Sequence, residues 1–307
     1  MHLELKVIYD VVRHQKKIKE AIRKYGHFAE HNYLHYLHNE NCRNKNVFFD
    51  FGNNKGMLMQ LDKKNNIWSL FPNGILAPKS ERLDLFLEAA NYILKKQKAK
   101  KFVVEVLEDM RKEILTKLKT INSFRACSNN YVLYWPVYNM NSWDLSLKGG
   151  KWKKLRNIRN RFYNVNRVRV KDSKDVPREE LRKILFDWLK RRSYNDRVDE
   201  EYYLNLIDNN FKGVDMAKTM YVNGEPCTIT AGWKIPNSNG YYSSIGILNY
   251  SCPGLGEAAN IDDLNRLKKK GFDYADFGGS ERVLLYFKKK FRPDKIYKTY
   301  IFSIVRK

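Results

Sequence analysis

A chain of 307 residues is long for a single compact core, which predicts two domains. Hydrophobic residues make up 43% of it and aromatic residues 14%, enough apolar surface to offset the entropy of folding, so global disorder is excluded. Lys and Arg number 58 against 34 Asp and Glu, and the net charge of +24 favours a polyanionic partner: nucleic acid, a nucleotide cofactor or an anionic membrane surface. The alternative is a solvated surface on a lysine-rich chain.

The sequence carries no signal that directs it into or across a membrane. No uninterrupted apolar run reaches the ~18 to 20 residues that a spanning helix needs, and the N-terminus lacks the apolar core of a signal peptide. We therefore expect a cytoplasmic protein without a transmembrane segment. The cysteines lack the spacing of a zinc site or a disulfide framework, which predicts reduced thiols in a core at Cys42, Cys127, Cys227 and Cys252.

All six histidines precede residue 39, and four of them recur at the spacing of one helical face: His27, His31, His35 and His38. His31 and His35, at i and i+4, would suit a metal ion, but no third ligand is evident. A polar helix face is therefore the preferred interpretation and no metal site is predicted. Whether this face has a role is left open.

Hydrophobic periodicity and turn residues predict the elements of the first half. Three strands are expected at 47–51, 57–61 and 67–71, followed by a helix at 83–96, a strand at 102–106, a helix at 109–118 and a strand at 131–135.

A basic segment follows at 151–171, with nine Lys and Arg residues and no acid. Leu155, Ile158 and Phe162 share one helical face, so its first part is predicted to be a basic amphipathic helix whose cations face solvent or a ligand. Phosphate contacts to a nucleic acid are expected from Lys151, Lys153, Lys154, Arg156, Arg159 and Arg161. Two further helices are predicted at 178–192 and 199–210.

The last third has the clearest signals. Asn223-Gly224 is typical of a type I′ hairpin between strands at 219–222 and 227–235, and a third strand follows at 241–248. A helix at 257–270, a strand at 274–277, a helix at 281–291 with Ser280 as N-cap and a strand at 296–305 complete the chain.

The order helix, strand, helix, strand occurs in both halves at an offset of roughly 170 residues, which favours duplication of one α/β unit. We expect a mixed-sheet α/β protein with an N-terminal lobe at 1–146 and a C-terminal lobe at 147–307 that holds the donor site.

Several short stretches occur in a characteristic order. They are Tyr131-Val-Leu-Tyr134, Leu147-Lys-Gly-Gly-Lys151 leading into Leu155-Arg156 and Arg161-Phe162, Pro253-Gly-Leu-Gly-Glu257, Tyr274-Ala-Asp-Phe-Gly-Gly279 and Phe287-Lys-Lys-Lys-Phe291. On these stretches the chain resembles the tandem GNAT transferases that include the Fem peptidoglycan aminoacyltransferases and the C-terminal domain of phosphatidylglycerol lysyltransferase. The resemblance covers most of 120–307 and is weaker in the first lobe. The complete Arg/Gln-x-x-Gly-x-Gly signature of acetyl-CoA enzymes is missing, which puts CoA in doubt.

The resemblance implies two places that hold the donor. The first amides of the helix after Gly254-Leu255-Gly256-Glu257 would bind phosphate, the alternative being an ordinary glycine-rich turn. The second place is a central strand that splays from its neighbour and exposes the N–H groups of Gly246, Ile247 and Leu248 to the donor carbonyl. Gly246 suits a bulge there, although a plain core glycine is the alternative.

Catalysis needs a base for the acceptor proton. Glu257, Asp276 and Glu281 are candidate bases and Tyr242 a candidate acid. First-turn dipole partners are the simpler interpretation of Glu257 and Glu281, so Asp276, mid-strand beside two glycines, is favoured. The resemblance places the pair Phe287-Lys288 beside the substrate and the tRNA end, where Lys289 would add a phosphate contact. A solvated helix face is the alternative for these lysines.

The resulting hypothesis is a transferase that moves an aminoacyl group from aminoacyl-tRNA to an amine or hydroxyl acceptor. An acyl-CoA-dependent N-acyltransferase and a non-catalytic RNA-binding protein of the same fold are the alternatives. No tightly bound cofactor is expected, because the donor, aminoacyl-tRNA or acyl-CoA, is a co-substrate. The expected partners are tRNA, a small-molecule, lipid or peptide acceptor and, peripherally, an anionic membrane.

Overall fold

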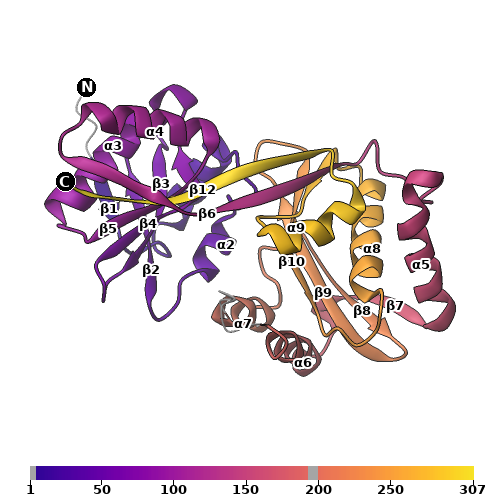
Figure 1. Cartoon of the computed structure of the whole chain (residues 1–307). Helices are drawn as coiled ribbons and strands as arrows, with labels where there is room; N and C mark the ends of the chain where they lie inside the picture. The colour runs from indigo at the N-terminus through magenta and orange to yellow at the C-terminus, as the bar shows by residue number, and fades with distance from the viewer. Residues whose placement is uncertain (1–4, 193–199) are drawn as a thin grey trace.

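One mixed sheet runs through the whole computed structural model, which describes residues 5–192 and 200–307. The twelve strands of the described ranges lie in the order β1-β2-β3-β4-β5-β12-β6-β11-β10-β9-β8-β7 (Figure 1). They are β1 (Lys6–Ile8), β2 (Asn44–Asp50), β3 (Gly56–Asp62), β4 (Ile67–Leu76), β5 (Lys101–Leu107), β6 (Phe124–Asn139), β7 (Val168–Asp172), β8 (Met216–Val222), β9 (Glu225–Lys234), β10 (Gly240–Leu248), β11 (Tyr274–Asp276) and β12 (Lys295–Arg306).

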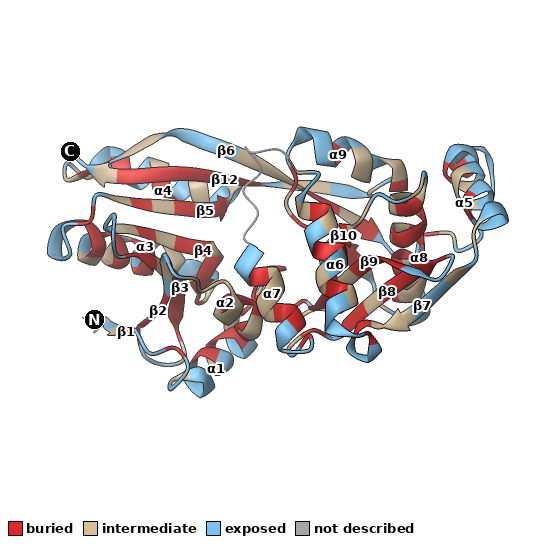
Figure 2. Cartoon of the chain, turned by 90° about the horizontal axis from the view of Figure 1, so that it is seen from below, coloured by how far each residue is buried: buried red, intermediate tan, exposed pale blue. Residues whose placement is uncertain are grey.

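Helices cover both faces of each half of the sheet. They are α1 (Gln15–Tyr25), α2 (Tyr33–His38), α3 (Arg82–Asn91), α4 (Glu108–Thr120), α5 (Lys153–Val165), α6 (Arg178–Leu189), α7 (Glu200–Asp208), α8 (Leu255–Lys269) and α9 (Arg282–Lys288). Neighbouring residues of one strand enter different cores: Phe49 packs with α3 and α4, and Phe48 with α1 and α2. In the second half, Trp233 packs with α6 and α7, and Tyr241 with α8. The strands are therefore buried on both sides, as the red ribbons of Figure 2 show.

The chain consists of two copies of one unit. The elements β2-β3-β4-α3-β5-α4-β6 recur as β8-β9-β10-α8-β11-α9-β12. The strand β4 begins at Ile67 and β10 at Gly240, and β5 begins at Lys101 and β11 at Tyr274, 173 positions later in both cases. The predicted duplication of an α/β unit is confirmed.

The two copies exchange their last strands. The first copy ends in β6, which pairs with β11 of the second, whereas β12 pairs with β5 of the first. The strands β6 and β12 also pair with each other, and Figure 1 shows this long ribbon crossing from one lobe to the other. The boundary predicted after residue 146 falls in the connection between β6 and α5 and stays a prediction.

In each lobe the third and fourth strands of the repeat separate after a short parallel contact. The strand β4 pairs with β5 only at 67–69, and β10 pairs with β11 only at 240–242. Beyond Tyr242, β10 pairs with β9 on one side and, among the strands that the structure describes, with none on the other. This separation is the splayed central strand that the resemblance implied. The accompanying bulge lies at Ser244, between the registers of Ser243 and Ile245, and not at Gly246 as expected; Gly246 stays paired with Thr230.

Some local predictions differ from the structure in detail. The strand expected at 131–135 lies within β6, which is sixteen residues long, and the helix expected at 83–96 is α3 as far as Asn91 and a π-helix from Tyr92 to Lys96. Ser280 is not a helix cap, because its hydroxyl donates to the carbonyl of Gly278 (3.2 Å) and Glu281 occupies the N-cap position. The helix predicted at 178–192 ends at Leu189, and the predicted start at 199 lies outside the described residues.

The histidines form no polar helix face, because α2 spans only Tyr33–His38 and two of them are buried. His31 donates from Nε2 to the carbonyl of Asn73 (3.1 Å), and His35 Nδ1 lies 2.9 Å from the Tyr202 hydroxyl. Burial lowers the pKa of His35 to about 3. His31 therefore serves packing within the first lobe, and His35 serves packing between the lobes, where it contacts Tyr202 and Trp233.

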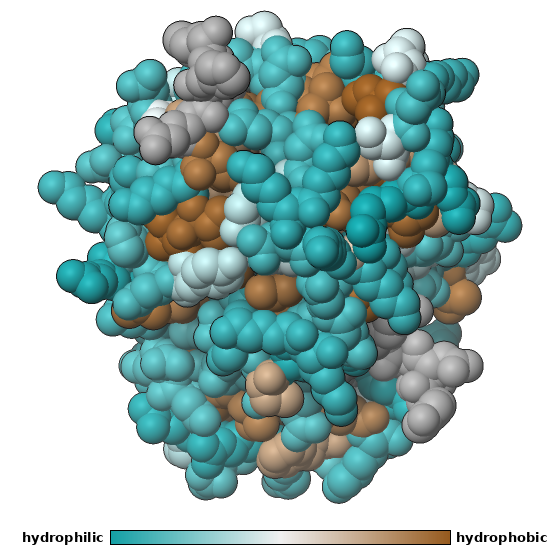
Figure 3. Space-filling model, turned by 90° about the vertical axis from the view of Figure 1, so that its left-hand side faces the viewer, coloured by the Kyte–Doolittle hydropathy of each residue, from teal (hydrophilic) through white to brown (hydrophobic). Residues whose placement is uncertain are grey.

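The four thiols are free, but only Cys227 is buried; Cys42 is exposed and the other two are intermediate. Among residues 5–192 and 200–307, no helix is long and apolar enough to cross a membrane. The first-lobe end of the molecule is hydrophilic over most of its surface, with apolar side chains in separate patches (Figure 3).

Candidate active site

Three acids, which we name the junction acids, lie where the two lobes meet. Glu30 precedes α2, Glu105 belongs to β5, and Asp276 ends β11 and is 3% exposed. Each accepts a hydrogen bond from a hydroxyl group: Glu30 from Tyr242 (3.0 Å), Glu105 from Thr299 (2.7 Å) and Asp276 from Tyr297 (2.6 Å).

Strand exchange assembles this cluster. Trp135 of β6 stacks on Tyr297 of β12 with ring centroids 5.6 Å apart, and its indole N–H donates to Thr299 (2.9 Å). In the second lobe, Tyr242 lies opposite Asp276 in the short parallel contact of β10 with β11. The junction acids therefore lie at the point where β10 begins to separate from β11.

Burial raises the pKa of all three carboxyl groups: that of Glu30 to about 8, that of Glu105 to about 7 and that of Asp276 to about 6. For Glu30, the charges of Glu105 and Asp276 add to the effect of burial. For Asp276, hydrogen bonds from Tyr297 and from the backbone N–H of Gly278 (2.9 Å) oppose it. Near neutral pH Asp276 is thus the member that most readily carries charge.

Lys288 of α9 is the cation whose charge acts on Asp276. Its ammonium donates to the carbonyls of Phe277 and Gly278. Burial lowers the pKa of Lys288 to about 8, and the charge of Asp276 opposes that change. One ammonium against three carboxyl groups leaves negative charge that must be protonated or neutralised by a bound cation.

The raised pKa of Glu30 predicts a pH-dependent stability. Because the folded protein holds a proton that the unfolded chain releases near pH 4.5, the free energy of unfolding should fall as pH rises from about 4.5 to about 8. Glu30→Gln keeps the acceptor oxygen for Tyr242 and removes the charge. It should flatten this fall and stabilise the protein at pH 8 by about 1 kcal/mol or more, the equivalent of one pKa unit.

Urea denaturation at pH 5.5 and pH 8 measures this effect. Glu225→Gln, at an exposed position, is the control and should leave the pH dependence unchanged. An unfolding free energy of Glu30→Gln that declines with pH as steeply as that of the unmodified protein would contradict the assignment.

The residues predicted to hold the donor phosphate, 254–257, lie at the N-terminus of α8, and we call them the donor loop. Gly254 has φ = 84°, in the left-handed region that favours glycine, and no side chain caps the first amides of the helix. A Cβ on Gly254 would lie 3.2 Å from Ile158, and one on Gly256 would lie 3.2 Å from the Phe287 ring. Pro253 is exposed and both glycines are half-buried, so this turn is accessible from the surface.

The open edge of β10 lies beside this loop. Gly246 is exposed, and a Cβ there would meet no atom within 4 Å. Ile247 is buried and Leu248 packs near α8, so the two residues after Gly246 anchor the strand. The edge of β10 that faces β11 is unpaired at Gly246, as the resemblance requires, because the recorded pairing of these strands ends at Tyr242.

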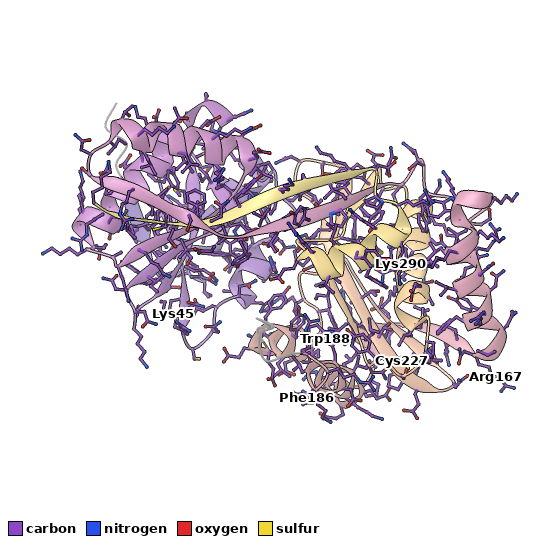
Figure 4. The ribbon with its side chains drawn as sticks, in the orientation of Figure 1. Lys45, Arg167, Phe186, Trp188, Cys227 and Lys290 are labelled. Carbon is purple, nitrogen blue, oxygen red and sulfur yellow. The ribbon has the colours of Figure 1, made fainter. Side chains whose placement is uncertain are left out.

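Helix α9 connects the donor loop with the junction acids. Phe287 packs on Gly256, and Lys288 reaches the carbonyls beside Asp276. Lys290, just beyond α9 and labelled in Figure 4, donates to Glu257 on α8 (2.7 Å). Glu257 is therefore tied into an ion pair at the donor loop, apart from the junction acids, and Lys289 points to solvent.

The basic segment forms α5 at the outer end of the second lobe (Figure 1). Two of its six predicted phosphate contacts already bind the protein: Arg156 donates to the carbonyls of Leu147 (2.5 Å) and Gly149 (3.1 Å), and Arg159 donates to Asn160. The other four are exposed, and the Lys151 ammonium lies 5.4 Å from the ring centroid of Trp152; these four are Lys151, Lys153, Lys154 and Arg161.

Sequence reasoning missed Glu30, Glu105 and Tyr297. Glu105 alternates with the apolar Val104 and Val106, which predicts a solvent-facing side chain on an ordinary strand. Glu30 lies 212 positions before Tyr242, its hydrogen-bond partner. No local sequence pattern predicts contacts over such a distance. For Glu105, its place as an acid within an otherwise apolar strand was a usable signal.

Two duplicated α/β lobes with splayed central strands, a glycine-bounded helix N-terminus at the splay and the junction acids beside it define a tandem GNAT transferase. The family described as phosphatidylglycerol lysyltransferase, C-terminal, matches residues 41–303. The chain belongs to this family and is an enzyme of the acyl- and aminoacyltransferase class.

Solved structures share the fold at low sequence identity. L-PGS from Bacillus licheniformis is 15% identical with a TM-score of 0.65, covering 94% of this chain and 91% of the other. The C-terminal domain of a protein assigned as a lysylphosphatidylglycerol synthetase from Agrobacterium fabrum is 14% identical with a TM-score of 0.65, covering 95% and 91%. FemX is 14% identical with a TM-score of 0.60, covering 98% and 96%. No curated protein sequence matches the chain.

Proposed function

We propose that this chain transfers an aminoacyl group that carries a cationic side chain from aminoacyl-tRNA to a hydroxyl or amine acceptor, with a phospholipid hydroxyl as the favoured acceptor. The observation that carries the proposal is the excess of acids at the lobe junction: Glu30, Glu105 and Asp276 lie together, and within the described residues Lys288 is the cation whose charge acts on one of them, Asp276. A bound ammonium group would restore the balance at a low-dielectric site, where charge pairing is strong. The family description, which names a lysyl group and phosphatidylglycerol, supports the same choice.

The roles proposed for the site residues follow from their positions. Asp276 would accept the acceptor's proton as its oxygen or nitrogen attacks the aminoacyl carbonyl. The bond from that carbonyl carbon to the tRNA ribose oxygen breaks, and the proton ends on the ribose hydroxyl. The N–H groups of Gly246, Ile247 and Leu248 on β10 would stabilise the developing oxyanion.

The donor's phosphate would bind at the first amides of α8, after Gly254. Free N–H groups and the positive end of the helix dipole favour an anion there. Lys290 supports this role because its ion pair neutralises Glu257, which would otherwise repel a phosphate. Phe287, packed on Gly256, would contact the terminal nucleotide of the donor.

The exposed cations of α5 are proposed to bind the tRNA backbone. Replacing Lys153, Lys154 and Arg161 with alanine should weaken binding of tRNA and lower the slope of log affinity against log salt by about 2 to 3, close to one unit per lost phosphate contact. Fluorescence anisotropy over a salt series measures this slope.

An equal loss of charge elsewhere is the control. The exposed first-lobe residues Lys64, Lys96 and Lys119, replaced by alanine together, should change the slope by less than about one unit. If both triple variants lose the same amount, α5 is not a specific RNA surface and long-range charge alone explains the binding.

The reaction itself is tested with tRNA carrying radiolabelled lysine, alanine or glutamate. We expect label to move into the lipid fraction of phosphatidylglycerol vesicles from lysyl-tRNA, and much less from the other two donors. Assays with acetyl-CoA and longer acyl-CoAs, together with amine acceptors, test whether an acyl-CoA is the donor instead. If no charged tRNA serves as donor and an acyl-CoA is turned over, the chain is an N-acyltransferase and the proposal is wrong.

A further inference from the structure

Helix α9 exposes three apolar side chains, which we name the α9 patch. Val283 is 87% exposed, Tyr286 is 76% exposed and Leu284 is 45% exposed. Figure 2 shows pale blue, the colour of exposed residues, along α9 where it lies beside the β6 and β12 ribbon. Large apolar side chains gathered in this way mark a surface that contacts another body.

The buried side of the same helix belongs to the candidate active site. Leu285 is buried, Phe287 packs on Gly256, and Lys288 bonds to the carbonyls next to Asp276. A partner that binds the α9 patch would therefore lie across the helix from Asp276 and Gly256.

Cations stand at both ends of α9 and form what we name the basic rim: Lys289, Arg292 and Lys298, all exposed. Lys298 lies at the beginning of the helix, because its partner in the β6 and β12 ladder, Tyr134, forms a β-bridge with Ser280. The other two follow the end of the helix. Apolar side chains between cations complement a surface that is apolar inside and anionic outside.

We propose that α9 docks this protein onto an anionic phospholipid bilayer, with the α9 patch at the boundary of headgroups and acyl chains and the basic rim among the lipid phosphates. The proposal goes beyond the transfer reaction, since bilayer binding needs neither donor nor catalysis. Docked in this way, the protein would hold the junction acids against the membrane surface.

Nucleic acid fits the α9 patch less well. The aliphatic Val283 and Leu284 can neither stack on a base nor bind a phosphate, whereas both gain by leaving water for acyl chains. The basic helix α5, at the outer end of the lobe, offers RNA a surface richer in cations.

Co-sedimentation with vesicles tests the proposal, using the full chain without tRNA. The unmodified protein should bind vesicles of equal parts phosphatidylglycerol and phosphatidylcholine and bind pure phosphatidylcholine weakly. Replacing Val283, Leu284 and Tyr286 with serine together should weaken binding to the mixed vesicles about tenfold or more. The exposed positions suggest that the thermal unfolding midpoint will stay unchanged, which is measured alongside.

Val12→Ser with Val165→Ser is the matched control, because these side chains are 57% and 72% exposed in other parts of the molecule. This double variant should bind vesicles like the unmodified protein. The proposal is overturned if the triple serine variant binds vesicles as tightly as the unmodified protein, or if the unmodified protein does not bind anionic vesicles. A triple variant that loses tRNA affinity while keeping vesicle affinity would assign α9 to nucleic acid instead. Because the readout is binding, its failure is distinguishable from failure of the transfer assay.

Discussion

Asp276→Asn is expected to slow aminoacyl transfer at least about a hundredfold while the protein stays folded, the lower end of what a positioned general base contributes. Asparagine keeps one oxygen for the N–H of Gly278, and its amide NH2 can donate to the Tyr297 hydroxyl, which turns from donor to acceptor. The asparagine side chain cannot accept a proton. Because the carboxyl group is buried, loss of its charge removes a desolvation cost and should not destabilise the fold.

The pH profile separates this role from a structural one. Burial raises the pKa of Asp276 to about 6, and the ionised form is the base, so kcat/KM of the unmodified enzyme should rise with pH and level off above about 6. The residual activity of Asp276→Asn should not show this rise with pH. Asp273→Asn, at an exposed position three residues earlier, should keep both rate and profile. An Asp276→Asn enzyme with unchanged rate would move the base to another carboxylate, Glu257 or Glu30.

The sequence predicts local elements well because their signals are local. Asn223-Gly224 has positive φ at both positions, 54° and 91°, as the type I′ turn requires, and the strands on either side follow directly. The turn at Gly254 and the helix after it are equally local. These elements were sufficient to identify the duplicated α/β unit and, through the resemblance, its class.

What the sequence does not reveal depends on contacts between distant residues. No local sequence signal near Trp135 or Tyr297 predicts that β6 and β12 change places between the lobes. That exchange nevertheless covers Glu105 and brings Thr299 to it. The bulge is a smaller example. Glycine tolerates an irregular strand, which favoured Gly246, but the pairing of β10 with β9 sets the irregularity two residues earlier, at Ser244.

The exchange also explains why the site lies at the junction. In each lobe the strand on the far side of the separation has an exchanged neighbour: β5 pairs with β12, and β11 pairs with β6. In the second lobe this neighbour carries Trp135, which stacks on Tyr297, the hydrogen-bond partner of Asp276. An isolated second lobe would lack β6, so both lobes are needed to position the proposed base.

Gly246→Trp is expected to lower transfer at least about a hundredfold by filling the gap beside β10, since a misplaced donor loses the benefit of orientation. Ile245 and Ile247 pack with α6 and α7, so the residue between them points to the other face of the sheet, where α8 lies. Gly246 is exposed and a Cβ there meets no atom within 4 Å, so the larger side chain begins in open space. Binding of lysyl-tRNA should weaken along with the rate, while the thermal unfolding midpoint stays close to that of the unmodified protein.

Gly150→Trp provides the matched control, because a Cβ there also meets no atom within 4 Å and the position precedes α5, away from β10. It should leave the transfer rate unchanged. If Gly246→Trp bound and turned over its donor normally, the gap between β10 and β11 would not hold the reactive carbonyl. The proposal that the β10 amides stabilise the oxyanion would then be rejected, because an indole beside β10 and a donor carbonyl held by those amides cannot occupy the same space.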